Sequence, residues 1–401
     1  MSAIASPPGT APPSPQAVGA PALEAVLPGM GPAGLLVLSA PELCIVVPTF
    51  NERANVAELV RRVSTALAGR TWELIFVDDD STDGTAAEVR ALSRRMPNVR
   101  CVRRVGRRGL GSACIEGMLA TSAPLVAVMD ADLQHDERLL ARMADVLTSD
   151  PHVDVVIGSR YVAGGGTGTW ASSRVRASRI ATGLAWRVTH TDVADPMSGF
   201  FMLRLDTVHE LVPRLSGIGF KILLDVLASS PRPLRCVELP YVFRERIAGE
   251  SKLDNRVIWD YLMLLADKTV GRWVPVRFLS FGIVGGLGVG VHLAALSALY
   301  VAAGVGFALA QALATLVAMT FNFLLNNALT WRDRQLHGAA LLRGWLSFVA
   351  ACSIGALANV GVAAYLFSMD TFWMLSALAG IAVGVVWNYA VTATYTWRAG
   401  A

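Results

Sequence analysis

The sequence predicts an α/β domain followed by four transmembrane helices. A mean hydropathy of +0.47, with only 16% charged residues, is too apolar for an ordinary soluble protein of 401 residues. The apolar excess begins near residue 278, and most of the charge lies before it. A chain of this length has room for two or three domains. We expect an α/β domain over 41–253, an amphipathic helix and linker over 254–275, and a transmembrane domain over 276–401.

The first forty residues differ from the rest in composition. They are rich in Pro, Ala, Gly and Ser, and the first Lys or Arg of the chain is Arg53. A secretory signal would carry basic residues ahead of its apolar segment. We therefore expect residues 1–40 to form a disordered tail and the α/β domain to lie in the cytoplasm.

Cysteine, histidine and net charge exclude several classes of protein. The five cysteines form no CxxC pair, which is typical of reduced thiols, and the six histidines have no zinc-site spacing. A net charge of +4 is too small to indicate a nucleic-acid partner.

Four apolar runs of 23 or 24 residues are long enough to cross a bilayer, for which about 20 residues suffice. They cover residues 278–300, 307–329, 345–367 and 372–395. Basic residues lie before the first run, between the second and third runs, and after the fourth. They are Arg272 and Arg277, then Arg332, Arg334 and Arg343, and finally Arg398. The other two connections contain no Lys or Arg, so the positive-inside rule places both termini in the cytoplasm of a multi-pass inner or plasma membrane protein.

The membrane half contains an internal repeat. The segment "FNFLLNNALTWR" (321–332) is similar to "WNYAVTATYTWR" (387–398), 66 residues further on. Each hairpin is therefore one unit used twice, and the arrangement resembles GtrA-like membrane domains. Two interpretations stay open: a duplicated anchor, or a lipid path lined by intramembrane asparagines, namely Asn322, Asn326, Asn327, Asn359 and Asn388.

In the first half, short apolar strands alternate with helical stretches. This alternation predicts a parallel sheet with helices on both faces. The expected strands are 43–48, 73–78, 99–102, 125–130 and 153–159. Ligands bind such sheets outside the carboxyl ends of the strands.

Three of these strand ends are acidic: "VVPTFNE", "VDDDSTDGT" and "VAVMDADLQHD". Like charges at one edge repel unless a cation or hydrogen-bond donors balance them. Alternate residues that leave a strand point the same way, so Asp130, Asp132 and Gln134 can present oxygens to one hard cation. We expect Mg²⁺ or Mn²⁺ there, with substrate phosphate completing the coordination.

Seven motifs together resemble dolichyl-phosphate mannosyltransferases of glycosyltransferase family 2. They are "PTFNE", "DDDSTDGT", "GRRGLGSA", "DADLQH", "GSRY", "DPMSGF" and "FRERIAGESKL", in that order, and the resemblance covers about residues 43–270. It implies a GT-A fold and transfer of mannose from GDP-mannose to a polyprenyl phosphate. Related members use UDP-glucose.

The resemblance also assigns site residues. Those matching the family's nucleoside contacts are Pro48, Phe50, Glu52, Val77 and Asp79. The metal and diphosphate site would comprise Asp130, Ala131, Asp132 and Gln134, and the anion-binding groups would be Arg246 and Lys252. Phe50 stands where the family often has Tyr, and Asp136 stands where Pro is common.

The acceptor chemistry follows from ionisation. A lipid phosphomonoester has a second pKa of about 6, so it attacks as a dianion and needs no general base. It needs cations to place it, and the candidates are Arg160, Arg174 (or Arg176) with Ser178, and Arg246. Direct attack would invert an α-linked donor sugar to a β-linked product.

Two further functions remain as alternatives. One is a UDP-glucose-dependent undecaprenyl-phosphate glucosyltransferase. The other is a lipid-linked sugar flippase module with a regulatory GT-A domain. The helices expected at 174–188 and 254–270 are either membrane-surface or core helices; in the second, Ile258, Tyr261, Leu262 and Leu265 share one face.

Overall fold

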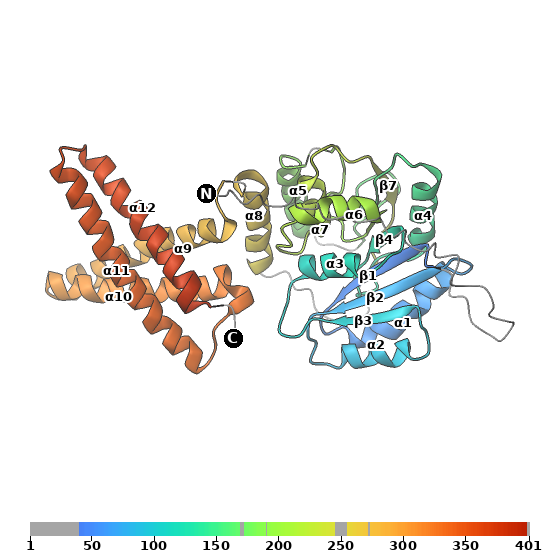
Figure 1. Cartoon of the computed structure of the whole chain (residues 1–401), viewed down its shortest axis with the longest axis horizontal. Coiled ribbons are helices and arrows are strands. Elements are labelled where there is room, and N and C mark those ends of the chain that lie inside the picture. The colour runs from blue at the N-terminus through green and yellow to red at the C-terminus, as the bar shows by residue number, and fades with distance from the viewer. Residues whose placement is uncertain (1–39, 169–171, 190, 245–254, 272, 399–401) are drawn as a thin grey trace, which may run out of the picture. The chain divides into compact units, whose positions relative to one another are not determined.

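The computed structural model describes residues 40–168, 172–189, 191–244, 255–271 and 273–398. These residues form a seven-stranded sheet with its helices and four long apolar helices (Figure 1). The expected tail lies outside the described residues, apart from Ala40.

The sheet is mostly parallel, as predicted. Its order is β3-β2-β1-β4-β6-β5-β7, and only β6 runs antiparallel to its neighbours β4 and β5. The strands are β1 (Leu43–Thr49), β2 (Trp72–Asp78), β3 (Val99–Arg103), β4 (Leu125–Val128), β5 (Val155–Ser159), β6 (Phe201–Arg204) and β7 (Cys236–Pro240). The central strands are apolar throughout because helices cover both of their faces. The neighbours β2, β1 and β4 bring the three acidic strand ends to one edge of the sheet.

Helices pack on both faces of the sheet. One face is covered by α1 (Arg53–Ala66), α2 (Thr85–Ser93) and α4 (Leu139–Ser149), whose apolar side chains share a core with Phe76. The other face is covered by α3 (Leu110–Leu119), α6 (Leu205–Leu211) and α7 (Ile222–Ser229), around Val126. This three-layer arrangement leaves the carboxyl edge of β1, β2 and β4 to the loops.

Helices α5 (Ser172–Ala185) and α8 (Asn255–Val270) pack together beside α7. The Tyr261 hydroxyl donates a 2.6 Å hydrogen bond to the Ala181 carbonyl, and Leu265 is partly buried in the same cluster. Ile258 and Leu262 are 57% and 43% exposed. The stripe predicted for α8 is therefore divided between the core and the surface.

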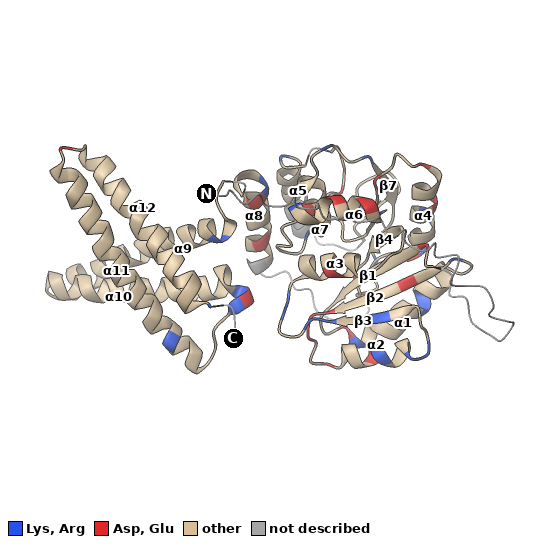
Figure 2. Ribbon diagram, in the orientation of Figure 1, with Lys and Arg blue, Asp and Glu red and all other residues tan. Residues whose placement is uncertain are grey.

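The four expected membrane spans are confirmed as helices. They are α9 (Val276–Leu296), α10 (Phe307–Leu325), α11 (Ala339–Ser368) and α12 (Trp373–Val391), and all but α11 continue into a π-helical turn. Each is long and apolar enough to cross a membrane. Charged residues are almost absent along them (Figure 2). The protein is a membrane protein.

The repeat seen in the sequence is repeated in the contacts. In the first hairpin, the hydroxyls of Ser280 and Thr330 are 2.7 Å apart; in the second, those of Ser347 and Thr396 are 3.0 Å apart. In both hairpins the hydrogen bond joins the start of one helix to the π-helical turn that ends its partner. The two hairpins are therefore equivalent in their internal packing.

The asparagines after α10 have structural partners. Asn326 accepts a hydrogen bond from Thr330, and its own amide donates to the carbonyl of Asn322. Asn327 accepts from the Leu336 amide and from the Trp397 indole. Both side chains are buried and fix the chain beyond the helix.

Candidate active site

Side-chain hydrogen bonds join the loops that follow β1 and β2. The Asn51 amide donates to Ser81 Oγ over 2.9 Å, and the Thr82 amide donates to Asn51 Oδ1 over 3.0 Å. The Arg53 amide donates to Asp83 Oδ2 over 3.1 Å. In the sheet, Pro48 pairs with Val77. The two strand ends that carry the predicted nucleoside contacts therefore form one surface.

Donors balance the acidic cluster after β2. Asp78 accepts hydrogen bonds from the amide and hydroxyl of Ser81, and Asp80 accepts two from Arg103. Asp79 accepts from Arg104 and from a backbone amide. Of the two ways to balance these charges that the sequence left open, a cation or hydrogen-bond donors, the protein supplies donors at this strand end.

Asp79 is held on two sides. Arg104 Nη1 lies 2.6 Å from Oδ1, and the Gly109 amide lies 2.6 Å from Oδ2. Burial raises the pKa of Asp79, while these two hydrogen bonds oppose the rise. Sequence reasoning missed Arg104, which is one of several arginines in the basic run "RRVGRR"; only its burial distinguishes it.

Phe50 and Glu52 lie on the β1 side of this surface. The guanidinium of Arg108 lies 4.3 Å from the centre of the Phe50 ring, in a cation–π contact. Glu52 precedes α1 and accepts a 2.8 Å hydrogen bond from the Asn55 side chain. Flat aromatic and guanidinium groups are suited to stacking against a nucleobase.

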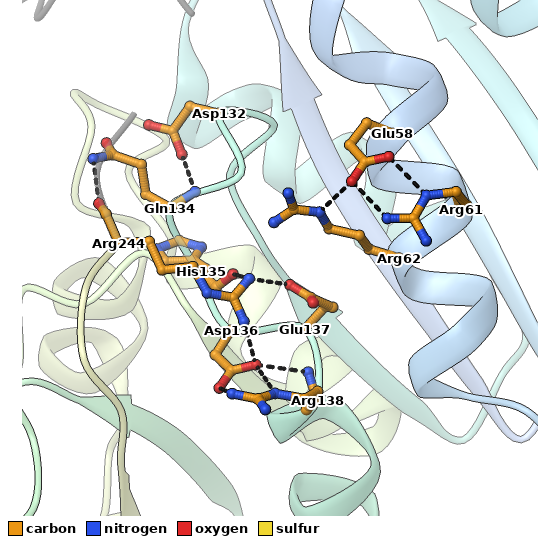
Figure 3. Close-up of polar contacts among 10 residues, drawn as sticks. All are labelled: Glu58, Arg61, Arg62, Asp132, Gln134, His135, Asp136, Glu137, Arg138 and Arg244. Carbon is orange, nitrogen blue, oxygen red and sulfur yellow. Dashed lines mark hydrogen bonds and ion pairs between the residues drawn. The ribbon is translucent and has the colours of Figure 1, made fainter. Parts of the chain in front are cut away.

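The oxygen-bearing residues after β4 lie in a turn. The strand ends at Val128, and Leu133 has a left-handed φ of 63°. The Gln134 amide donates to Asp132 Oδ1 over 3.2 Å (Figure 3). The predicted extended alternation of Asp130, Asp132 and Gln134 is therefore wrong, although all three belong to this one turn.

The turn fits a divalent ion that is completed by phosphate. Among the described residues, no three His, Cys, Asp or Glu side chains are close enough to form an all-protein metal site. Mg²⁺ and Mn²⁺ commonly use one or two carboxylates, with water and substrate phosphates. Asp130 and Asp132 would supply the carboxylates, and Ala131 between them is buried. Gln134 donates its Nε2 to the Arg244 carbonyl, so its other amide atom, the oxygen, can face the ion.

The His135 ring contacts both the main-chain amide and the carboxylate of Asp130. Its Nδ1 accepts a hydrogen bond from the Asp130 amide over 3.3 Å, so the proton of the neutral ring is on Nε2, 3.7 Å from Asp130 Oδ2. Burial lowers the pKa of His135 to about 4. The ring stacks on Phe200, and a side chain on Gly199 would collide with the Asp130 carboxylate. Sequence reasoning missed His135, although it ends the motif "DADLQH".

Arg160 forms a buried ion pair. Its Nε and Nη2 each lie 2.7 Å from an oxygen of Asp195, which is fully buried. Burial alone would lower the pKa of Arg160, but the hydrogen bonds that Arg160 donates to the Asp195 carboxylate raise it. Asp195 in turn receives support from Glu238, which accepts its amide hydrogen bond. Arg160 was predicted to bind the acceptor phosphate, but two of its guanidinium nitrogens donate to Asp195 instead.

The described residues assemble only part of the predicted acceptor cluster. Ser178 on α5 is 2.8 Å from the Tyr161 hydroxyl, which joins the helix to the segment after β5. Arg174 belongs to α5, but its side chain lies outside the described part. Arg246 and Lys252 lie outside the described residues.

Residues 44–212 match glycosyltransferase family 2, and residues 280–397 match the GtrA/DPMS transmembrane domain. The chain is 33% identical over 358 residues to the dolichol-phosphate mannosyltransferase of Pyrococcus furiosus, covering 89% of this chain and 99% of that one. It is 36% identical to the enzyme of the same name from Saccharomyces cerevisiae, covering 60% and 91%. It is 29% identical to the polyprenol monophosphomannose synthase of Mycolicibacterium smegmatis, covering 56% and 85%. With an acidic turn at the edge of a GT-A sheet, followed by two matched membrane hairpins, this chain belongs to the dolichol-phosphate mannosyltransferases of glycosyltransferase family 2.

Proposed function

We propose that this chain transfers mannose from GDP-mannose to a polyprenyl, dolichyl-type phosphate and inverts the sugar to give a β-linked product. One observation carries the proposal. The turn with Asp130, Asp132 and Gln134 follows β4, beside the β1 and β2 ends, in a chain that matches a dolichol-phosphate mannosyltransferase over 99% of that enzyme's length.

The donor occupies the edge formed by β1, β2 and β4. In this proposal Phe50 and Asp79 contact the nucleobase, the first by stacking and the second by accepting hydrogen bonds from its N–H groups. Pro48 and Glu52 complete the nucleoside site, whereas the side chain of Val77, also predicted to contact the nucleoside, is fully buried in the core of the sheet. The motif resemblance supports GDP-mannose over UDP-glucose.

The diphosphate lies against the turn after β4. Asp130, Asp132 and Gln134 would hold Mg²⁺ or Mn²⁺, which when bound supplies positive charge against the negative charge that develops on the departing diphosphate. Lys252 and Arg246 are candidates to contribute further positive charge there.

The acceptor phosphate needs positioning and no deprotonation. A dianionic phosphate oxygen attacks the anomeric carbon directly while the bond to the nucleotide breaks, which inverts the configuration. Arg174 and Arg246 are the cations that we assign to the acceptor, and we assign Ser178 to the same site. Arg160 orders the segment after β5 through Asp195.

The positive flanks of the spans favour a cytoplasmic α/β domain and cytoplasmic termini. The measurement is protease protection in sealed inverted membrane vesicles. In such vesicles the cytoplasmic face is outside, so protease added to the exterior should digest the α/β domain. Protection of the domain would show that the orientation is the opposite one.

The activity test uses membranes containing the full chain, polyprenyl phosphate and labelled GDP-mannose or UDP-glucose. Labelled lipid from GDP-mannose is expected with Mn²⁺ or Mg²⁺, and background labelling with a chelator or in Asp132→Ala. The control Asp145→Ala removes an exposed carboxylate of α4 and should retain activity. Labelling from UDP-glucose alone would favour the glucosyltransferase, undiminished labelling in Asp132→Ala would reject the metal role, and an α-linked product by NMR would reject inversion.

A further inference from the structure

Arg244 contacts the turn after β4 with both its main chain and its side chain (Figure 3). Its amide donates to the Gln134 carbonyl over 3.0 Å, and its carbonyl accepts from Gln134 Nε2 over 2.9 Å. Its guanidinium donates to Asp136 Oδ1 over 2.8 Å and to Glu137 Oε2 over 2.6 Å. Its Nη1 also donates to the His135 carbonyl over 3.4 Å, so one residue is joined to four consecutive residues after β4.

The main-chain contacts determine the orientation of the Gln134 side chain. A carbonyl oxygen only accepts hydrogen bonds, so the amide nitrogen must face Arg244. Within the described part of the chain, Gln134 Oε1 has no hydrogen-bond partner. Turning the amide over would place two oxygens against each other and remove the oxygen from the ligand side. The orientation that suits a cation is therefore the one that the Arg244 carbonyl imposes.

The side-chain contacts hold the Arg244 backbone in place. The side chains of Arg244, Asp136 and Glu137 are 30%, 21% and 11% exposed, so the ion pairs are partly shielded from solvent. Asp136 also receives two hydrogen bonds from Arg138, which fix its carboxylate.

We propose that Arg244 is a positioning residue of the donor site. Its ion pairs with Asp136 and Glu137 keep its carbonyl against Gln134 Nε2, and the carbonyl keeps Gln134 Oε1 directed at the divalent ion and diphosphate. This inference rests on the proposed function, because it needs a metal–nucleotide complex at the turn. Loss of a partner that orients a metal ligand typically weakens metal binding about 10- to 100-fold.

The test measures Mn²⁺ binding to the full chain in detergent by electron paramagnetic resonance, with saturating GDP and, in a second arm, UDP. We expect Arg244→Met to raise the Kd for Mn²⁺ about tenfold. Arg62→Met is the matched control. Arg62 lines a surface pocket together with Arg244 and Glu137, but its guanidinium donates to Glu58 on α1. The Kd of Arg62→Met for Mn²⁺ should therefore equal that of the wild type. Equal Kd values for Arg244→Met and wild type would overturn the proposal.

A double-mutant cycle separates positioning from general loss of structure. If Arg244 acts through Gln134, then Arg244→Met should change the Kd for Mn²⁺ little once Gln134→Ala is present. Full additivity of the two losses would overturn the proposal. Should Arg244→Met fail to fold, Glu137→Gln removes one charge of the anchor and should raise the Kd by a smaller factor in the same direction; no change would again overturn it.

The same measurement distinguishes the two levels of inference. A wild-type chain that binds no Mn²⁺ with either nucleotide would overturn the proposed metal-dependent function, and the positioning role with it. A wild-type chain that binds Mn²⁺ while Arg244→Met binds it equally well would overturn only the role of Arg244.

Discussion

Arg104 Nη1 donates a 2.6 Å hydrogen bond to Asp79 Oδ1, and the two side chains are only 3% and 10% exposed. Arg104 also donates to Ser112 Oγ over 2.6 Å, so the guanidinium is fixed from α3 as well. A buried carboxylate with a fixed cation beside it has a defined orientation before any ligand arrives. The nucleoside surface therefore depends on a residue that does not itself belong to the predicted contacts.

Replacing Arg104 should destabilise the α/β domain. Arg104→Met leaves the buried Asp79 carboxylate without its cation, and breaking a buried ion pair in this way costs about 3–5 kcal/mol in the free energy of unfolding. The control is Arg107→Met, which removes a 60% exposed partner of Glu116 and should cost at most about 1 kcal/mol. Thermal unfolding of the full chain in detergent compares them, and equal midpoints would show that the Arg104 pair is not important for stability.

The same pair predicts a pH dependence of donor binding. Burial raises the pKa of Asp79, and the hydrogen bond from Arg104 holds it down. Weakening that hydrogen bond should raise the pKa of Asp79 further. On acidification, the Asp79 carboxylate, which we propose accepts nucleobase N–H groups, would then become protonated at a higher pH. Ser112→Ala, which releases one anchor of Arg104, should therefore shift the acid-side rise of the donor KM to higher pH while kcat at neutral pH is unchanged. An unshifted KM profile would separate Asp79 from nucleoside binding.

Close packing of α12 on α11 predicts an asymmetry between two helical glycines. A Cβ on Gly380 would lie 2.5 Å from the Asn359 backbone oxygen, whereas a Cβ on Gly361 would meet nothing within 4 Å. Overpacking of this kind costs about 1–3 kcal/mol, so Gly380→Ala should lower the midpoint of thermal unfolding in detergent. Gly361→Ala should leave it unchanged or raise it, because Ala is the better helix former. Equal midpoints would contradict the packing of these two helices.

The sequence predicted β1 to β5, most of which are continuous apolar runs. The runs at β1 and β2 alternate with amphipathic helices, which is the signal of a parallel sheet covered on both faces. It did not predict β6, whose four residues are too few to show a period, or β7, in which Glu238 interrupts the apolar pattern. The antiparallel direction of β6 depends on tertiary packing that no local pattern records.

The sequence predicted which residue types belong to the candidate site, but it did not predict their geometry. Motifs located Asp132 and Gln134, but the left-handed Leu133 replaces the extended alternation with a turn. The partners were missed for another reason: Asp195 lies 35 residues from Arg160, and the fold alone brings them together. Local spacing predicts which side chains follow the end of a strand. Contacts between residues far apart in the sequence determine which of those side chains already have a protein partner.

The stacked indoles of Trp331 and Trp397 end the two membrane repeats, with ring centres 5.6 Å apart and planes 10° from parallel. Trp397 Nε1 donates to Asn327 Oδ1 over 3.0 Å. The equivalent of Asn327 in the second repeat is Ala393, which has no acceptor side chain, and among the described residues the buried Nε1 of Trp331 has no partner. Among the described residues, the indole of the second repeat therefore donates a hydrogen bond to a side chain, and the equivalent indole of the first repeat does not.

This asymmetry predicts different costs for the same substitution. Trp397→Phe loses a hydrogen bond as well as ring area, whereas Trp331→Phe removes an N–H that is already unpaired. Trp397→Phe should therefore destabilise the membrane domain by about 1 kcal/mol more, measured as the difference in thermal unfolding in detergent. The two substitutions remove similar ring area and retain stacking, so each is the control for the other. Equal losses, or a larger loss for Trp331→Phe, would mean that the Trp331 indole has a partner in the membrane, such as a water or a lipid headgroup, and that the two repeats are balanced after all.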